Sequence, residues 1–151
     1  MNMESSQPIE QSQPFGARMQ QGSLEPVSFT SKTVPFWCPI CFEQELEVGQ
    51  LNGTQVCACE QCRGFLIDSQ SFASLVRNGR RGFQGADDQP KPMNVEELAS
   101  TIACPTCQQT MYTHPYHGPG NVVINSCNTC QLNWLDAGEL AKIIRAPGFR
   151  G

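Results

Sequence analysis

The sequence contains an internal repeat of cysteine pairs that all have the spacing Cys-X-X-Cys. Cys38-Pro-Ile-Cys41 is followed after 17 residues by Cys59-Glu-Gln-Cys62, and Cys104-Pro-Thr-Cys107 is followed after 19 residues by Cys127-Asn-Thr-Cys130. Such self-similarity indicates two structural units of the same kind. We therefore expect each unit to gather four cysteines around one site.

The similarity continues past the last cysteine of each unit without a gap. Leu66-Ile67-Asp68 follows Cys62 at the same distance as Trp134-Leu135-Asp136 follows Cys130. Apolar residues with the i, i+3, i+4 spacing of one helix face come next, so each unit is expected to end in a short helix. These residues are Phe72, Leu75 and Val76 in the first unit and Leu140, Ile143 and Ile144 in the second.

The residues around the two expected helices predict where each begins and ends. Asp136 is a preferred N-cap, and Glu139 is placed to reach back to the N–H of that cap. Pro147-Gly148 then ends this helix. In the first unit, Asp68 is the expected cap and Asn78-Gly79 the expected exit.

The cysteine pattern favours zinc over a disulfide framework. Disulfides suit small secreted domains, but the count of nine is odd, the N-terminus has no export signal, and eight of the nine cysteines fall into the four pairs. Two Cys-X-X-Cys turns supply the four thiolates of a tetrahedral zinc site. We predict two Zn²⁺ ions and metal-dependent folding, with disulfides or iron in a four-cysteine site as the alternatives.

The segments between the cysteine pairs predict hairpins. Asn52-Gly53 is a tight-turn signal between two short strands, Glu45–Val48 and Thr54–Val56. In the second unit, Gly118-Pro-Gly120 precedes the β-branched run Val122–Ile124. Cys57 aligns with Asn125 rather than with a cysteine, so it is interpreted as a small strand residue near the first site, with a redox sensor as the alternative.

Composition divides the chain into two ordered units and polar connections. Leu, Ile, Val and Phe make up about a fifth of the residues, which is too few for one ordinary core. The expected divisions are a disordered arm (1–35), a first unit (36–78), a linker (79–102), a second unit (103–146) and a tail (147–151). Within the linker, Asn94–Ala99 is expected to form a short capped helical turn.

The residues of the second unit resemble the TFIIB-type zinc-ribbon domains of transcription factors. The likeness rests on Cys104-Pro-Thr-Cys107, Met111, Gly118–Ile124, Cys127-Asn-Thr-Cys130 and Trp134–Leu140, and it extends more loosely over 38–78. It implies small metal-stabilised β units in tandem, each with a short C-terminal helix. It also implies one zinc site made of Cys38, Cys41, Cys59 and Cys62, and a second made of Cys104, Cys107, Cys127 and Cys130.

The resemblance further implies that Trp134, Leu135 and Leu140 pack the helix against the ribbon. Glycines usually follow the fourth cysteine in that family, whereas Gln131 and Leu132 stand here. Because a non-glycine residue in a left-handed turn costs about 1–2 kcal/mol, a different local backbone is expected at this point.

Catalysis is not expected from the sequence. His114 and His117 could bind metal or act as bases in a hydrolase, but they lie in a Pro/Gly-rich segment typical of a solvated loop. Asp136 and Glu139 already have an expected capping role. A site with four thiolate ligands also leaves no open position for water or substrate.

The expected function is that of a non-catalytic interaction module, with a transcription-related role suggested by the family resemblance. Phe36, Trp37 and Trp134 are its candidate aromatic anchors. Nucleic-acid binding through two basic clusters is the alternative, although a net charge of −4 opposes phosphate contact. Those clusters are Arg77, Arg80 and Arg81, and Lys142, Arg145 and Arg150.

Two further expectations concern metal handling and location. Zinc storage or sensing is a weaker alternative, because closed four-thiolate sites tend to hold their metal. No apolar run approaches the roughly 18 residues of a membrane helix, and no secretory signal is present, so a cytoplasmic protein without membrane contact is expected.

Overall fold

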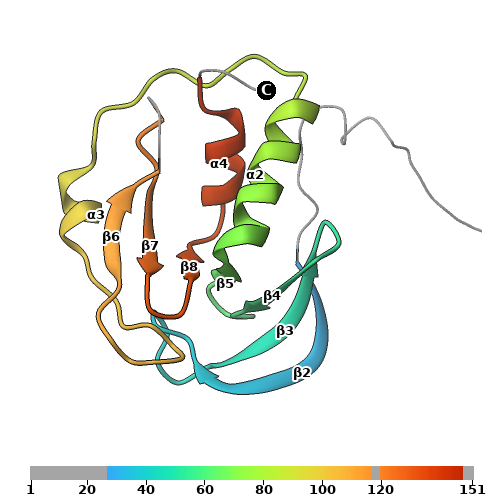
Figure 1. Cartoon of the computed structure of the whole chain (residues 1–151), viewed down its shortest axis with the longest axis vertical. Helices are drawn as coiled ribbons and strands as arrows, with labels where there is room; N and C mark the ends of the chain where they lie inside the picture. Colours follow the sequence, from blue (N-terminus) through green and yellow to red (C-terminus); the bar gives the residue numbers. More distant parts are fainter. Residues whose placement is uncertain (1–26, 117–119, 148–151) are drawn as a thin grey trace, which may run out of the picture.

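The computed structural model describes residues 27–116 and 120–147, and within them the strands form one antiparallel sheet (Figure 1). The order of the strands is β2-β3-β4-β5-β8-β7-β6. Their bounds are β2 Ser28–Trp37, β3 Glu45–Leu51, β4 Thr54–Ala58, β5 Phe65–Asp68, β6 Tyr112–Pro115, β7 Val123–Cys127 and β8 Leu132–Leu135.

The two repeat units are joined through equivalent strands, β5 and β8. These strands pair antiparallel, and Leu66 lies directly opposite Trp134, its counterpart in the repeat. A local two-fold axis therefore passes between equivalent residues at the centre of the sheet. Separate tandem units, as expected from the sequence, are wrong. The four strands of the first unit would leave an open edge at β5 and the three of the second an open edge at β8, and pairing these two edges satisfies both.

The hairpins are formed as the sequence predicts where the structure describes them. Strands β3 and β4 are joined at Asn52 and Gly53, whose φ angles of 50° and 82° suit the tight turns preferred between twisted strands. Strand β7 pairs with β6 and begins at Val123, one residue later than the β-branched run Val122–Ile124 suggested. Of the expected Gly118-Pro-Gly120 turn, Gly118 and Pro119 lie outside the described residues.

The sheet separates two apolar clusters. Phe65, Ile67 and Leu135 belong to the cluster that includes the buried residues of the helices that follow β5 and β8, whereas Leu66 and Trp134 belong to a second cluster around the cysteines. Successive residues of β5 and β8 thus alternate between the two clusters, as the pleat of a strand requires. The helices cover one face of the sheet, and the cysteine sites lie with the other cluster.

Helix α2 (Ser69–Gly82) begins as predicted but ends later. Asp68 is its N-cap, since its Oδ2 accepts a 3.0 Å hydrogen bond from the N–H of Ser71. The predicted exit at Asn78-Gly79 is wrong. Gly79 lies inside the helix, where a Cβ atom would overlap the side chain of Ile144 on helix α4 (Glu139–Arg145), so this glycine permits the close approach of the two helices.

The start of helix α4 differs from the prediction in one respect. Its N-cap is Gly138, which has a left-handed φ of 85°, and not Asp136. The reach of Glu139 is confirmed, because its Oε1 accepts a 2.9 Å bond from the N–H of Asp136. The carboxylate of Asp136 instead accepts a 3.0 Å bond from Nε1 of Trp134, which takes it away from the helix terminus.

Strand β2 corrects the expected disordered arm over 1–35, because residues 28–35 belong to the sheet; residues 1–26 lie outside the described part. Phe29 packs against one apolar cluster, whereas Val34 and Phe36 pack against the other. The register with β3 shifts between Phe29 and Thr33 and again between Thr33 and Trp37. These irregularities interrupt the alternation that would have revealed the strand.

The linker expected over 79–102 is shorter than predicted. Residues 79–82 belong to α2, and the capped turn within the linker is confirmed as helix α3 (Val95–Ala99). Asn94 caps α3 by accepting bonds from Glu96 and Glu97 N–H at 3.0 and 3.1 Å. The segment between α2 and α3 passes over the ends of α2 and α4, and α3 lies beside β6 (Figure 1).

Of the expected tail, Pro147 is described and residues 148–151 lie outside the described part. None of the helices in the described ranges has both the length and the apolar character needed to cross a membrane.

Candidate metal centres

The first site gathers two cysteines that follow β2 and two that lie between β4 and β5. The Sγ atoms of Cys38, Cys41, Cys59 and Cys62 all lie within 4.8 Å of one another. Two of these separations are 3.7 Å between Cys38 and Cys62 and 3.8 Å between Cys41 and Cys59. Each Cys-X-X-Cys turn contributes one buried and one half-buried cysteine, so the site is partly screened from solvent.

The second site gathers its four cysteines in the same arrangement. The Sγ atoms of Cys104, Cys107, Cys127 and Cys130 also lie within 4.8 Å of one another, with 3.6 Å between Cys107 and Cys127. Sequence reasoning missed Thr106, whose hydroxyl lies 3.2 Å from the sulfur of Cys104 and 3.1 Å from that of Cys130. The signal in the sequence that could have suggested this role is the position of a hydroxyl residue between the two cysteines of the turn.

The sulfur separations fit a tetrahedral metal site. Zn–S bonds of about 2.3 Å in a regular tetrahedron place neighbouring sulfurs about 3.8 Å apart. A disulfide would bring two sulfurs to about 2.05 Å, far below the separations found here. All nine cysteines are described, and all are free thiols. The two four-cysteine clusters are consistent with two zinc sites.

Backbone N–H groups point at the sulfurs, as expected where the negative charge of a thiolate must be stabilised. The N–H groups of Cys41, Cys62 and Cys130 each lie 3.4 Å from the sulfur of the preceding cysteine in their turn. Hydrogen bonds to the charged form of a group favour that form. The turns therefore prepare their sulfurs to bind a cation.

The residue that follows each cysteine pair has a left-handed backbone. The φ angles are 68° for Phe42, 68° for Arg63, 67° for Gln108 and 58° for Gln131. A different backbone after the fourth cysteine, expected because glycine is missing there, is therefore wrong. The non-glycine residues accept a cost of about 1–2 kcal/mol each because the turn must close around its sulfurs.

The pKa values of the thiols show why the clusters need a cation. Burial raises the pKa of Cys62 far above its usual range, and the neighbouring Cys38 adds to this effect. Burial also raises the pKa of Cys104, but hydrogen bonds from Thr106 and the Cys107 N–H outweigh it and lower that pKa to about 7. Four crowded thiols ionise together only when a bound cation compensates their charge.

The two sites share one apolar cluster. Leu66 and Trp134, on the local two-fold axis, are buried together with Leu46 and Met111 and with cysteines of both sites. A Cβ atom at Gly64 would overlap the indole of Trp134, so a glycine is needed at this position, two residues after Cys62, for the indole to pack here. This shared cluster is a feature that repeat analysis did not predict.

Cys57 lies outside both four-cysteine clusters. It is half-buried on β4, opposite Val48 of β3 and Leu66 of β5. Burial raises the pKa of its thiol, which disfavours the reactive thiolate. Its position is that of a strand residue beside the first site.

The candidate catalytic residues are placed in structural roles. Nε2 of His114 lies 2.7 Å from the hydroxyl of Ser126, and its ring stacks on Tyr112 with centroids 4.8 Å apart. His117 lies outside the described residues. Asp136 and Glu139 are occupied by the hydrogen bonds at the start of α4.

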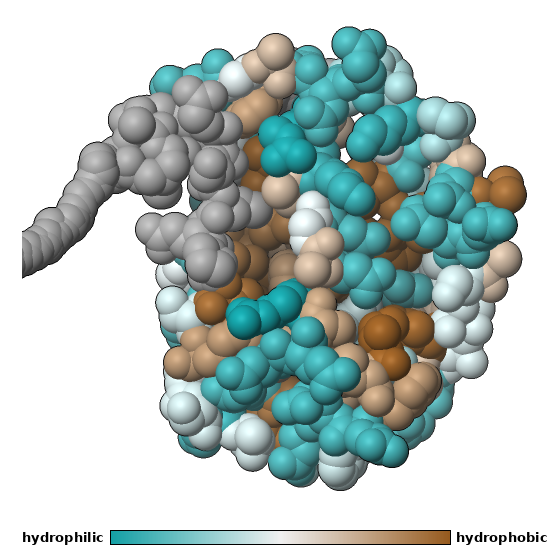
Figure 2. All heavy atoms as spheres, turned by 180° about the vertical axis from the view of Figure 1, so that it is seen from behind, coloured by the Kyte–Doolittle hydropathy of each residue, from teal (hydrophilic) through white to brown (hydrophobic). Residues whose placement is uncertain are grey.

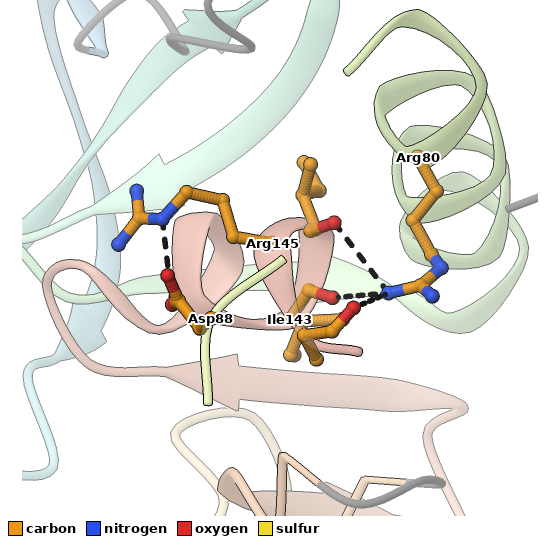
Figure 3. A network of polar contacts seen from close by, with 6 residues as sticks. Arg80, Asp88, Ile143 and Arg145 are labelled. Carbon is orange, nitrogen blue, oxygen red and sulfur yellow. Dashed lines mark hydrogen bonds and ion pairs between the residues drawn. The ribbon is translucent and has the colours of Figure 1, made fainter. Parts of the chain in front are cut away.

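The two predicted basic clusters are partly used inside the fold (Figure 3). Arg80 reaches from α2 to the end of α4, where it donates to the carbonyls of Ile143 at 2.8 Å and Ala146 at 3.1 Å. The guanidinium of Arg145 pairs with Asp88 at 3.5 Å. Arg77, Arg81 and Lys142 are exposed, and Arg150 lies outside the described residues.

The candidate aromatic anchors separate clearly by exposure. Trp134 is fully buried and Phe36 is half-buried, whereas Trp37 is 52% exposed, Ile40 41% and Phe42 73%. On the face shown in Figure 2, apolar side chains reach the surface as separate patches between hydrophilic areas. Trp37, Ile40 and Phe42 are therefore three large exposed apolar residues on the first Cys-X-X-Cys turn and the residues beside it.

Comparison with known proteins agrees with the second site. Residues 103–146 match a family model described as transcription factor zinc-finger, the TFIIB-type zinc ribbon. No curated protein and no solved structure gave a match. The matched range contains the second four-cysteine site and does not extend to the first, whose ribbon-like arrangement rests on the repeat and on the geometry described above.

Proposed function

We propose that this protein is a non-catalytic interaction module in which two structural Zn²⁺ ions hold a rigid sheet. The observation that carries the proposal is the contrast between two turns. We call residues 37–43 the first knuckle and residues 103–109 the second knuckle. The first presents large exposed apolar side chains, and the second does not.

The two knuckles have the same backbone, which makes the contrast informative. Phe42 N–H donates to the carbonyl of Cys38 at 3.0 Å, and its counterpart Gln108 N–H donates to that of Cys104 at 2.8 Å. Trp37, Ile40 and Phe42 of the first knuckle correspond to Ala103, Thr106 and Gln108 of the second. The apolar side chains are therefore not needed to build the turn.

Clustered exposure of this kind supports protein binding. Single exposed apolar residues are ordinary, but contiguous ones mark interaction sites, and aromatic residues are enriched among binding hot spots. The turn also holds them in place, because Cys38 N–H donates to Gln44 O at 2.8 Å and Glu43 N–H to Cys41 O at 2.7 Å. A preorganised surface loses little entropy on binding.

The metal sites support a structural role for zinc. Four sulfurs complete a tetrahedron, so no position is open for water or substrate. Both sites lie against a shared buried cluster, where their ions would hold the sheet together. The description of the matched family makes a transcription-related partner the first class to examine.

Nucleic-acid binding has less support. Arg80 and Arg145, from the two candidate basic clusters, are engaged with α4 carbonyls and with Asp88. The chain carries a formal charge of −4, and thiolates around divalent ions make it more negative.

The proposal is tested by giving the first knuckle the residues of the second. The triple variant Trp37→Ala, Ile40→Thr, Phe42→Gln should bind zinc and fold, since the chain already carries these residues on an equivalent backbone. Wild type and variant are used as baits in nuclease-treated extracts, and bound proteins are quantified by mass spectrometry. We expect a defined partner that is retained by wild type and lost with the variant.

The matched control alters the second knuckle. Thr106 supports the sulfurs, so the control is Ala103→Ser with Gln108→Ala, which should retain the partner. Recovery of the same proteins on all three baits would contradict an interaction role for the first knuckle.

A further inference from the structure

We infer that the first knuckle binds a basic segment of a partner protein, one that carries Lys or Arg beside large apolar side chains. This inference rests on the proposed interaction role and names the chemistry of the partner. It comes from the charges that surround Trp37, Ile40 and Phe42.

Acidic residues outnumber basic ones around the first knuckle; Lys32 and Arg63 flank the acidic range, and the guanidinium of Arg63 lies over the Phe29 ring. Residues 33–62 contain no Lys or Arg and four glutamates. Glu43 directly follows Phe42, Glu45 lies opposite Trp37 in the β2–β3 pair, and Glu60 is exposed on the other turn of the same metal site. A divalent ion on four thiolates leaves a further charge of about −2 at this site.

These carboxylates form no ion pair within the described part of the protein. Glu47 accepts a 2.6 Å bond from the backbone N–H of Ser31. Among the described residues, no basic side chain lies within ion-pair distance of Glu43, Glu45 or Glu60. Their negative potential is therefore available to an approaching ligand.

The second unit shows that this acidity is not required by the fold. Residues 98–135 contain no Asp, Glu, Lys or Arg, yet they form the equivalent four-cysteine site and hairpin. Acidic and large exposed apolar residues thus occur together at the first knuckle and are both missing from the second knuckle, while Tyr112 is the large exposed apolar residue elsewhere in the described part of that unit. Their association on one surface is what a partner with complementary charge and apolar side chains would use.

Phe42 adds a second, independent argument. It is the most exposed large apolar residue at this site, and its backbone is left-handed with a φ of 68°. Arg63, Gln108 and Gln131 adopt the same backbone after their own cysteine pairs, so the turn does not require an aromatic side chain at this position. Gln108 occupies the equivalent position, so an aromatic side chain there serves a contact outside this chain.

The charge pattern also selects among occupants. Phosphate groups would be repelled, which disfavours nucleic acid at this surface. The N-terminal 26 residues contain three glutamates and one arginine, so they lack the required charge. A basic, apolar segment of another protein satisfies both features of the surface.

The test selects ligands without assuming their sequence. A phage library of random 16-residue peptides is panned on the zinc-loaded full chain, after depletion on the Trp37→Ala, Ile40→Thr, Phe42→Gln variant. Selected peptides are then synthesised and titrated against wild type, the triple variant and Glu43→Gln/Glu60→Gln. Isothermal titration calorimetry measures binding to all three proteins, because the triple variant lacks Trp37 and Trp134 is buried.

We expect peptides with net positive charge and at least two large apolar residues. Loss of the apolar side chains should weaken binding by about tenfold or more, as for hot-spot residues. Loss of two carboxylates should weaken it several-fold and reduce its salt dependence. Zinc content and the NMR spectrum of each variant verify that it is folded.

Three outcomes overturn the inference. Selected peptides that are neutral or acidic, or that bind Glu43→Gln/Glu60→Gln as well as wild type, would show that charge does not select the partner while leaving the interaction role intact. Self-association of wild type that the triple variant abolishes would make a second copy the occupant. Equal binding to wild type and the triple variant would remove both this inference and the proposed function.

Discussion

Among single residues, Glu139 has the most unusual environment outside the metal sites. It is a buried carboxyl at the start of α4, 8% exposed. Burial raises its pKa to about 8; the N–H of Asp136 opposes this rise, the carboxylates of Asp136 and Glu97 add to it, and Lys142 opposes it. The folded protein therefore keeps this carboxyl protonated at neutral pH, where an exposed glutamate is charged.

This shift predicts a pH-dependent stability. An unfolded glutamate has a pKa of about 4.3, so between that pH and about 8 the folded state holds a proton that the unfolded state has released. The stabilisation is complete below the unfolded pKa and is lost as pH rises through the folded pKa.

The variant Glu139→Gln should remove this dependence, because a neutral amide retains an oxygen for the Asp136 N–H. Melting temperatures at constant excess zinc are compared from about pH 6.5 to about pH 8.5, the range over which the folded carboxyl ionises. Wild type should lose stability relative to the variant as pH rises. Parallel curves would show that Glu139 does not take up a proton on folding in this range.

Among the secondary-structure elements, the α2–α4 pair depends on close approach and on a shared terminus. Phe72, Leu75 and Val76 of α2 and Leu140, Ile143 and Ile144 of α4 are buried in one cluster. Arg80 on α2 donates to the carbonyls of Ile143 in α4 and of its C-cap Ala146, at the end where helix carbonyls run out of intrahelical donors. The short α4 is thus completed by a residue 63 positions away in the chain.

Two glycines in α2 test this packing. Gly79→Ala should destabilise the protein by about 1–3 kcal/mol, because the added methyl group overlaps Ile144 despite the better helix propensity of alanine. Gly82→Ala, in the same helix and facing open space, should be neutral or stabilising by up to about 1 kcal/mol. Denaturant unfolding of the zinc-loaded proteins measures both. Equal stability of the two variants would mean that the helices lie further apart.

In the molecule as a whole, the two metal sites belong to one folding unit. The sheet is continuous across the β5–β8 pair, and the cluster around Leu66 and Trp134 contacts both sites. Loss of either metal would therefore disturb a core that the other half also uses. This differs from tandem ribbons on a flexible linker, which would unfold independently.

Removal of one metal site tests this coupling. In Cys104→Ser/Cys107→Ser, zinc content should fall from about two ions to less than one per chain, because apo sites favour unfolding. Amide signals of β3 and β4, which lie in the other half of the sheet, should lose dispersion in NMR spectra. Cys57→Ser is the matched control and should retain both ions, since Cys57 lies outside the clusters. One retained ion with intact β3–β4 signals would indicate independent units.

Features that depend on nearby residues could be predicted from the sequence. The Cys-X-X-Cys spacing indicated which sulfurs gather, and Asn52-Gly53 indicated the first hairpin. The helical faces followed from spacing of three and four residues, and Asp68 and Asn94 followed from capping preference. Each of these depends on a few neighbouring residues, so local chemistry is sufficient.

The arrangement of the two units could not be predicted in the same way. Strand β2 was missed because its register irregularities hide the alternation of buried residues. Asp136 was misplaced as a cap because the indole of Trp134, buried by tertiary packing, takes its carboxylate. Gly79 was interpreted as an exit because its contact, Ile144, comes from the other repeat.

The sequence by itself determined the two sets of four sulfurs, the helix faces and the acidic character of the first unit. Only the tertiary structure decided that the units share one sheet and one core, that Arg80 completes α4, and that Trp37, Ile40 and Phe42 remain exposed while Trp134 is buried. The reason is physical: ligand spacing and helix period are fixed within one segment of chain. Strand-edge pairing and exposure depend on which distant segment covers each surface.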